Sequence, residues 1–173
     1  MNSLKELPTL PSSLLRLHCA GNFLTSLTKL PVGLLYLNCS TNLLTELSLP
    51  DSLTHLNCCE NMLSCIPSLP ATLRSLCCCD NQLGHLPELP NHLVSLYCVS
   101  NCLKTLPVLP NSLRNLSTKI FFTSLMTNNK ISLSAFTAIM RKTKKGKSFY
   151  FFFASLSLFP YLSSKFKNFS LIF

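Results

Sequence analysis

Asparagine recurs along the first two thirds of this chain at an almost constant interval. The recurring residues, which are 19 or 20 positions apart, are Asn2, Asn22, Asn42, Asn61, Asn81 and Asn101. A fixed period of this length is the signature of a repeat protein, because each unit is too small to bury its apolar side chains alone and must stack on its neighbours. The chain is therefore predicted to form a repeat solenoid.

Each unit carries the same apolar pattern around its asparagine, L-x-x-L-x-C-x-x-N-x-L. In the first complete unit these positions are Leu14, Leu17, Cys19, Asn22 and Leu24. Leucine and cysteine alternate with other residues, which predicts one short strand per unit with both facing inward and a parallel sheet of stacked strands. An asparagine amide both donates and accepts hydrogen bonds, so it can satisfy backbone groups where the chain turns. We expect a structural ladder of Asn22, Asn42, Asn61, Asn81 and Asn101.

Proline marks the segments between the predicted strands. Most of these segments carry two prolines three residues apart, as Pro87 and Pro90 do. Proline has no backbone donor and forces the preceding residue into an extended conformation. We therefore predict an extended, polyproline-like outer layer instead of helices. The third unit is one residue shorter in this segment, where a deletion is easier to absorb than in a strand.

Repeat and composition both change near Thr118. Residues 1–118 hold six basic and six acidic side chains and all ten cysteines, whereas residues 119–173 hold nine basic side chains and no acidic one. The net charge of +9 therefore lies in the tail. The sixth unit loses the pattern where Phe121 stands in place of the asparagine. We predict a repeat domain of about five full units plus partial ends over 1–118, and a basic, Phe-rich tail over 119–173.

The leucine, asparagine and Leu-Pro-x-Leu-Pro positions of the first 118 residues resemble the short leucine-rich repeats of bacterial effectors of the YopM and IpaH type. This resemblance implies a horseshoe with a parallel β-sheet on the concave face, extended convex segments, and a role in recognition. In some relatives a ubiquitin ligase domain with a catalytic cysteine follows, but the tail here contains no cysteine. The family's export segment and helical cap have no counterpart at the start, so a truncated remnant is one alternative.

Side chains that point outward from the predicted strands form a polar, nearly uncharged face. Such a face suits a protein partner better than nucleic acid, and tyrosine and arginine are common anchors of protein interfaces. An ordinary solvated sheet face is the alternative interpretation. We expect a monomeric chain that binds an unidentified protein and no nucleic acid. The predicted protein-binding residues are Arg16, Tyr36, His55, Tyr97, His18, Asn38 and Asn57.

The cysteines and histidines give little sign of chemistry. The inward cysteines are expected to pack as small apolar side chains, as a reduced buried cysteine does. Cys59, Cys77 and Cys79 are expected to meet on the sheet surface, but the C-x-x-C spacing of common zinc sites is absent, so we predict no metal site and no cofactor. No acidic residue stands at a triad spacing from a histidine, and no glycine-rich phosphate loop occurs. We therefore predict no catalytic residues and no enzymatic activity.

The tail permits three interpretations. Apolar side chains at helical spacing from Ser132 to Arg141 could cap the last unit. Residues 141–164 combine a basic run with an uncharged stretch, as a membrane anchor does. Alternatively, the tail is irregular or disordered, or is noncoding translation.

The location of the protein and two alternative functions follow from the two ends of the chain. The amino-terminal residues do not form a secretory signal peptide, so we expect a cytoplasmic protein, or one exported to a host cytosol without cleavage. The alternative functions are a membrane-associated repeat protein anchored by its tail, and the substrate-recognition fragment of a leucine-rich repeat ubiquitin ligase.

Overall fold

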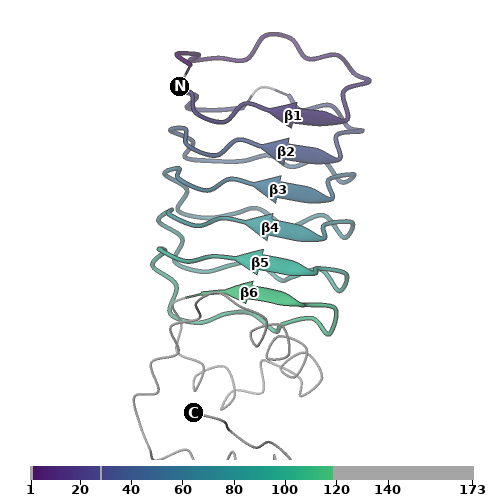
Figure 1. Ribbon diagram of the computed structural model, residues 1–173, viewed down its shortest axis with the longest axis vertical. Helices are drawn as coiled ribbons and strands as arrows, with labels where there is room; N and C mark the ends of the chain where they lie inside the picture. Colours follow the sequence, from purple (N-terminus) through teal and green to yellow (C-terminus); the bar gives the residue numbers. More distant parts are fainter. Residues whose placement is uncertain (1, 28, 119–173) are drawn as a thin grey trace, which may run out of the picture.

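The computed structural model describes residues 2–27 and 29–118. In this part each unit contributes one strand of three residues, and the strands pair in parallel in the order of the sequence (Figure 1). The prediction of a solenoid with a parallel sheet is confirmed. The strands are β1 (Arg16–His18), β2 (Tyr36–Asn38), β3 (His55–Asn57), β4 (Ser75–Cys77), β5 (Ser95–Tyr97) and β6 (Asn115–Ser117).

Equivalent positions of successive units lie side by side in the sheet. Leu37 of β2 pairs with Leu17 of β1 and with Leu56 of β3. The register therefore continues through the 19-residue unit, because the missing residue falls in the outer segment and not in the strand. Backbone pairing also extends past each strand, where the amide of Cys19 donates to the carbonyl of Asn38 at 2.9 Å.

One apolar core runs the length of the stack. The central leucines of β2 to β6 and the cysteines that follow β1 to β5 are buried, as Leu56 and Cys58 show with exposed fractions of 2% and 0%. Leu17 of β1 is only partly buried. Burying a leucine contributes about 1.5–3 kcal/mol to stability. Because these leucines are buried against the neighbouring units, each unit is stabilised mainly by the units on either side of it.

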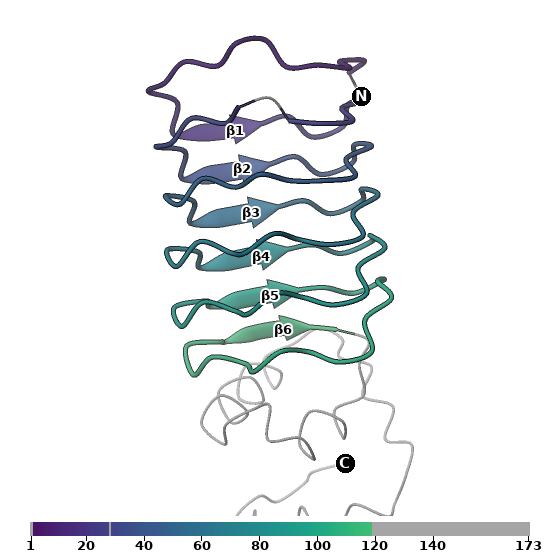
Figure 2. The same cartoon turned by 180° about the vertical axis from the view of Figure 1, so that it is seen from behind.

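The outer layer contains no helix within the described residues and runs behind the sheet as extended chain (Figure 2). The predicted non-helical outer layer is confirmed. At the end of each outer segment the carbonyl of a proline accepts a hydrogen bond from the leucine three residues later, for example from the Leu53 amide to Pro50 at 3.1 Å. This turn directs the chain into the next strand.

A second turn follows each strand and requires a left-handed residue. Gly21 has a φ of 68°, and the equivalent residues Thr41, Glu60, Asp80 and Ser100 have φ values of 54° or 55°. Residues with a Cβ rarely adopt this conformation, which costs roughly 1–2 kcal/mol each. The neighbouring hydrogen bonds must therefore hold the backbone in place.

Asparagines supply those hydrogen bonds. The Nδ2 atom of Asn61 donates to the carbonyls of Cys58 and Cys59 in its own unit and to that of Cys39 one unit earlier, at 3.1–3.2 Å. Its Oδ1 atom accepts from the amide of Leu44, also one unit earlier, at 3.0 Å. One side chain thus satisfies two turns and ties neighbouring units together. The same arrangement recurs at Asn42, Asn81 and Asn101.

The predictions made for the tail fall outside the described residues. They concern the end of the array at Phe121, the capping segment from Ser132 to Arg141 and the basic segment 141–164. Across 2–27 and 29–118, no helix is long and apolar enough to span a membrane.

Candidate functional site

The outward side chains of β1 to β6 form one continuous surface, which we call the sheet face. The middle residue of each strand is a leucine that faces the core, so the first and third residues face outward. Arg16 is the one Lys, Arg, Asp or Glu residue among these outward residues of the six strands. The sheet face therefore consists of Arg16, His18, Tyr36, Asn38, His55, Asn57, Ser75, Cys77, Ser95, Tyr97, Asn115 and Ser117.

Three rings lie against one another at the amino-terminal end of the sheet face. The ring centroids of His18 and Tyr36 are 4.8 Å apart, and those of Tyr36 and His55 are 6.0 Å apart. Tyr36 pairs in register with Arg16 on β1 and His55 on β3, and its ring reaches diagonally across to His18 on β1. We call His18, Tyr36 and His55 the ring cluster. Of the residues predicted from the sequence, the structure brings these three together with Arg16.

Tyr97 lies apart from the ring cluster. It belongs to β5, where its register partners are Cys77 and Ser117. Strand β4 separates it from His55 on β3. The side chain is 37% exposed, so it is accessible to a partner on its own. Tyr97 and the ring cluster therefore form two separate patches of the sheet face.

Asn38 and Asn57 are held by their own strand ends. The Oδ1 atom of Asn38 accepts from the amide and the hydroxyl of Ser40, at 3.1 and 2.9 Å. The Oδ1 atom of Asn57 accepts from the amide of Cys59 at 3.1 Å. Both side chains thus have a structural contact, and their role in binding stays a prediction.

Thr54, which no sequence pattern singled out, orients His55. The Thr54 hydroxyl donates to the carbonyl of Leu35 at 2.7 Å and lies 2.9 Å from Nδ1 of His55. A hydroxyl has one proton to donate, so it accepts from the Nδ1–H group of the ring. A neutral His55 then presents Nε2 as an acceptor. The sequence does show a threonine at position 54, where the equivalent positions of the neighbouring units are Leu35 and Arg74. The strand register was needed to see that this threonine contacts His55.

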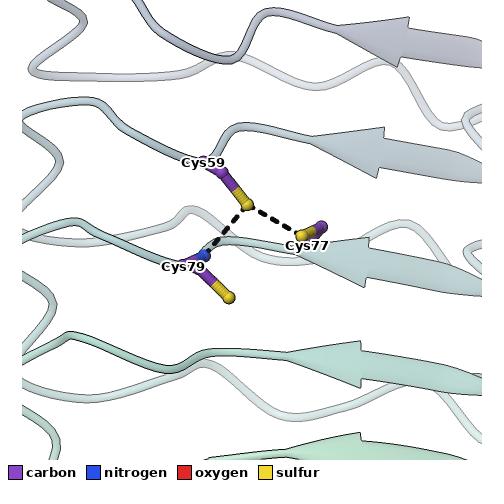
Figure 3. A group of neighbouring side chains, drawn as sticks. All are labelled: Cys59, Cys77 and Cys79. Carbon is purple, nitrogen blue, oxygen red and sulfur yellow. Dashed lines mark hydrogen bonds between the residues drawn. The ribbon is translucent and has the colours of Figure 1, made fainter. Parts of the chain in front are cut away.

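Three thiols meet further along the sheet face, as the sequence predicts. The Sγ atoms of Cys59, Cys77 and Cys79 all lie within 4.8 Å of one another (Figure 3). Those of Cys59 and Cys77 are 2.7 Å apart, and the amide of Cys79 donates to the Cys59 sulfur at 3.2 Å. The hydrogen bond from Cys59 lowers the pKa of Cys77 to about 6, whereas burial raises the pKa of Cys79. We call these residues the thiol cluster.

The inward cysteines have a different environment. Burial raises the pKa of Cys19 to about 11 and that of Cys58 to about 12, so these thiols are neutral near pH 7. Since the thiolate is the reactive form, they are unreactive packing residues. The buried inward set is Cys19, Cys39, Cys58, Cys78 and Cys98.

Comparison with known proteins finds similarity among solved structures. No protein-family model matches the chain, and neither does any curated protein sequence. YopM from Yersinia enterocolitica WA-314 matches 68% of this chain at 42% identity with a TM-score of 0.67. YopM from Yersinia pestis, described as a leucine-rich effector protein, matches 69% at 38% identity with a TM-score of 0.66. A Shigella effector LRR domain matches 79% at 28% identity with a TM-score of 0.59.

The matches differ in how much of the other protein they include. The chain spans 26% and 36% of the two YopM chains and 79% of the Shigella domain. The described part of this chain is the stack of units built on the leucine and asparagine positions. The repeat region of this chain is therefore a short leucine-rich repeat solenoid of the YopM and Shigella effector type.

Proposed function

We propose that this chain is a noncatalytic recognition module that binds another protein through the sheet face, in an effector-like role. The observation that carries the proposal is the ring cluster, in which three rings with Arg16 beside them form one preassembled patch. Two of the similar solved proteins are described as effectors, which supports the same role. We assign the module to residues 1–118.

The ring cluster suits an interface because its side chains are already ordered. His18 and His55 are exposed on either side of the half-buried Tyr36, and Thr54 fixes the orientation of His55. Ordering a free side chain on binding costs about 0.5–1.5 kcal/mol, and a packed ring has already lost much of that freedom. Tyrosine also offers a large apolar ring with a polar hydroxyl, which is why it is common in binding surfaces.

The charge of the sheet face favours a protein over nucleic acid. Arg16 is its one Lys or Arg side chain, whereas binding to a phosphate backbone requires several basic side chains on one surface. The complementary partner surface would be polar and aromatic, with a hydrogen-bond donor for Nε2 of His55. We propose that the binding is direct and requires no cofactor.

The size of the sheet face limits its affinity. Six strands at about 4.8 Å spacing cover roughly 29 Å, and a patch about 12 Å wide has an area of about 350 Å². A standard interface buries about 800 Å² on each partner. We therefore expect a dissociation constant of about 1 μM or weaker for a monomer that uses this face alone.

A capture experiment with matched variants tests this proposal. The full chain is immobilised as wild type, as the double variant Tyr36→Ala/His55→Ala, and as the control Val32→Ala/Val108→Ala. The two valines are 87% and 71% exposed and lie outside the sheet face. We expect a partner identified with the wild type to bind the control and to be lost from the sheet-face variant. Loss from the control alone would exclude the sheet face as the binding surface.

The location of the protein and the two alternative functions require separate tests. We propose that the module works in a cytosol, either that of its own cell or that of a host. A chain ending at Thr118 compared with the full chain in membrane fractionation tests the anchor proposed for 141–164. Association that disappears with the tail would favour the anchored protein. The ligase-fragment alternative predicts that the captured partner is a ubiquitination substrate, which an ubiquitin blot of the partner would test.

A further inference from the structure

The thiol cluster joins two neighbouring units on the sheet face. Cys59 follows β3, Cys77 is the last residue of β4, and Cys79 lies two residues beyond it. Because side chains alternate along the chain, Cys77 and Cys79 face outward while Cys78 between them is buried in the core. Because Asn57 pairs with Cys77, Cys59 lies beside Cys79 on the neighbouring unit. Figure 3 shows the sulfur atoms of Cys59 and Cys77 facing each other and the Cys79 sulfur beside them.

The sulfur positions are close to those that a metal ion requires. All three Sγ atoms lie within 4.8 Å of one another. A metal–sulfur bond of about 2.3 Å places two sulfur ligands about 3.8 Å apart in a tetrahedral site and about 4.0 Å apart in a trigonal one. Cys59 and Cys77, with sulfurs at 2.7 Å, would have to separate by about 1 Å. Rotation about the Cα–Cβ bond of a half-buried side chain achieves this without moving the backbone.

The backbone around the thiol cluster is firmly held. The amide of Cys59 donates to Asn57, while the carbonyls of Cys59 and Cys79 accept from Asn61 and Asn81 at 3.1 and 3.0 Å. The amide of Cys79 points at the Cys59 sulfur at 3.2 Å, where it would stabilise a thiolate. A site whose ligands are fixed by such contacts binds its ion with little cost in ordering.

The donor set selects the kind of ion. Among the described residues no histidine or carboxylate joins the three sulfurs, so the protein offers three soft ligands on one side. Zinc prefers four ligands in a tetrahedron, whereas Cu(I) is a soft ion that thiolates bind strongly. We propose that Cys59, Cys77 and Cys79 form a three-thiolate binding site for Cu(I). On binding, one Cu⁺ ion enters, the protons that the three thiols still hold leave to the solvent, and no electron is transferred.

A competition titration tests the proposed site in the full chain. The protein is fully reduced and kept without oxygen, and Cu(I) is supplied from a chromogenic Cu(I) chelator. We expect one tightly bound ion per chain, and X-ray absorption that shows three sulfur ligands. Binding of two sulfurs only, or tighter binding of Zn²⁺ than of Cu(I) in parallel titrations, would overturn the assignment.

Matched serine variants locate the site. Cys59→Ser, Cys77→Ser and Cys79→Ser each remove one ligand, and we expect each to lower Cu(I) affinity by at least about 100-fold. The control Cys65→Ser/Cys102→Ser removes two exposed thiols outside the thiol cluster and should leave the affinity unchanged. Circular dichroism confirms that every variant is folded. Equal losses in the control and the cluster variants would refute the proposed site.

Discussion

The side-chain Nδ2 atom of Asn42 donates a hydrogen bond to the backbone carbonyl of Cys19, 3.0 Å away and 23 residues earlier in the chain. The same amide carries an acceptor, Oδ1, which binds the backbone N–H of Leu24 in that earlier unit at 3.0 Å. Cys19 and Leu24 lie on either side of Asn22 in the sequence, so Asn42 closes the turn of its neighbour as well as its own. Each unit therefore depends on the next one for a complete set of hydrogen bonds.

Replacement of a central ladder residue should be costly. Asn61→Ala removes four hydrogen bonds and leaves the amide of Leu44 and three carbonyls without this partner. The three carbonyls keep the Asn42 and Asn81 side chains and the Thr41 amide as donors, so the Leu44 amide is the group left unsatisfied. An unsatisfied buried group costs about 1–3 kcal/mol and the other lost bonds add to this, so we expect the free energy of unfolding to fall by about 3 kcal/mol. Urea denaturation followed by circular dichroism measures it. The control Asn57→Ala, which removes one such bond, should cost about 1 kcal/mol; equal costs would contradict the ladder argument.

Backbone conformation predicts different effects on stability for the changes Gly21→Ala and Gly84→Ala. Gly21→Ala should lower the free energy of unfolding by about 1 kcal/mol, because φ is 68° although a new Cβ would meet no atom within 4 Å. Gly84→Ala also has open space but no positive φ, so it should be neutral or stabilising by up to about 1 kcal/mol. Thermal unfolding compares the two variants. A loss of stability in both would indicate a cause other than backbone conformation.

Thr41 offers the complementary test of the same turn. Its φ is 54°, and a β-branched residue adopts this conformation only under strain. Thr41→Gly should therefore raise the free energy of unfolding by about 1 kcal/mol, even though it removes the exposed hydrogen bond to Glu60. Urea denaturation of the single variant measures the change. A destabilised variant would show that the Thr41 side chain contributes more than its backbone conformation costs.

Buried thiols should make the stability depend on pH in the alkaline range. Burial raises the pKa of Cys19 and of Cys98 to about 11 from the ordinary value of 9.0. Above pH 9 the unfolded chain loses these protons while the folded chain keeps them. The stabilisation is therefore complete below pH 9 and declines up to about pH 11, by about 1.4 kcal/mol per pH unit for each thiol.

Comparison with a variant isolates the thiols from the other groups that titrate there. Burial raises the pKa of Cys39 as well, and its side chain is fully buried. Cys39→Ala lowers stability at neutral pH, but its plot of unfolding free energy against pH should be shallower than that of the wild type by about 1.4 kcal/mol per unit above pH 9. Urea denaturation at a series of pH values measures both slopes. Identical slopes for the two proteins would contradict a raised pKa of Cys39 in the folded chain.

The two tyrosines of the sheet face should differ in their effect on partner binding. Tyr36 contacts rings on both sides, whereas β4 separates Tyr97 from the ring cluster. Tyr36→Ala should weaken binding by about tenfold, which corresponds to about 1.4 kcal/mol, and Tyr97→Ala by less. Isothermal titration calorimetry with the captured partner measures both. A larger loss at Tyr97 would move the centre of the interface to the other patch.

Much of the fold follows from local pattern in the sequence. The alternation around Leu17 and Cys19 determined which side chains face the core, and the prolines determined that the outer layer has no helix in the described part. Both conclusions hold because a repeat places every unit among copies of itself, so that a local pattern also defines the neighbours. The outward position of Tyr36 and of the three clustered cysteines followed from the same alternation.

Only the tertiary structure decided how the outward side chains meet. The contact of Tyr36 with His18 and His55, the separate position of Tyr97, and the role of Thr54 depend on strand register and on side-chain rotamers across units about twenty residues apart. The sequence also did not indicate the left-handed conformation of the residue before each ladder asparagine. Of these residues only Gly21 is a type that commonly adopts a positive φ. Sequence periodicity states which residues share a face, whereas the packing of side chains between neighbouring strands determines which of them touch.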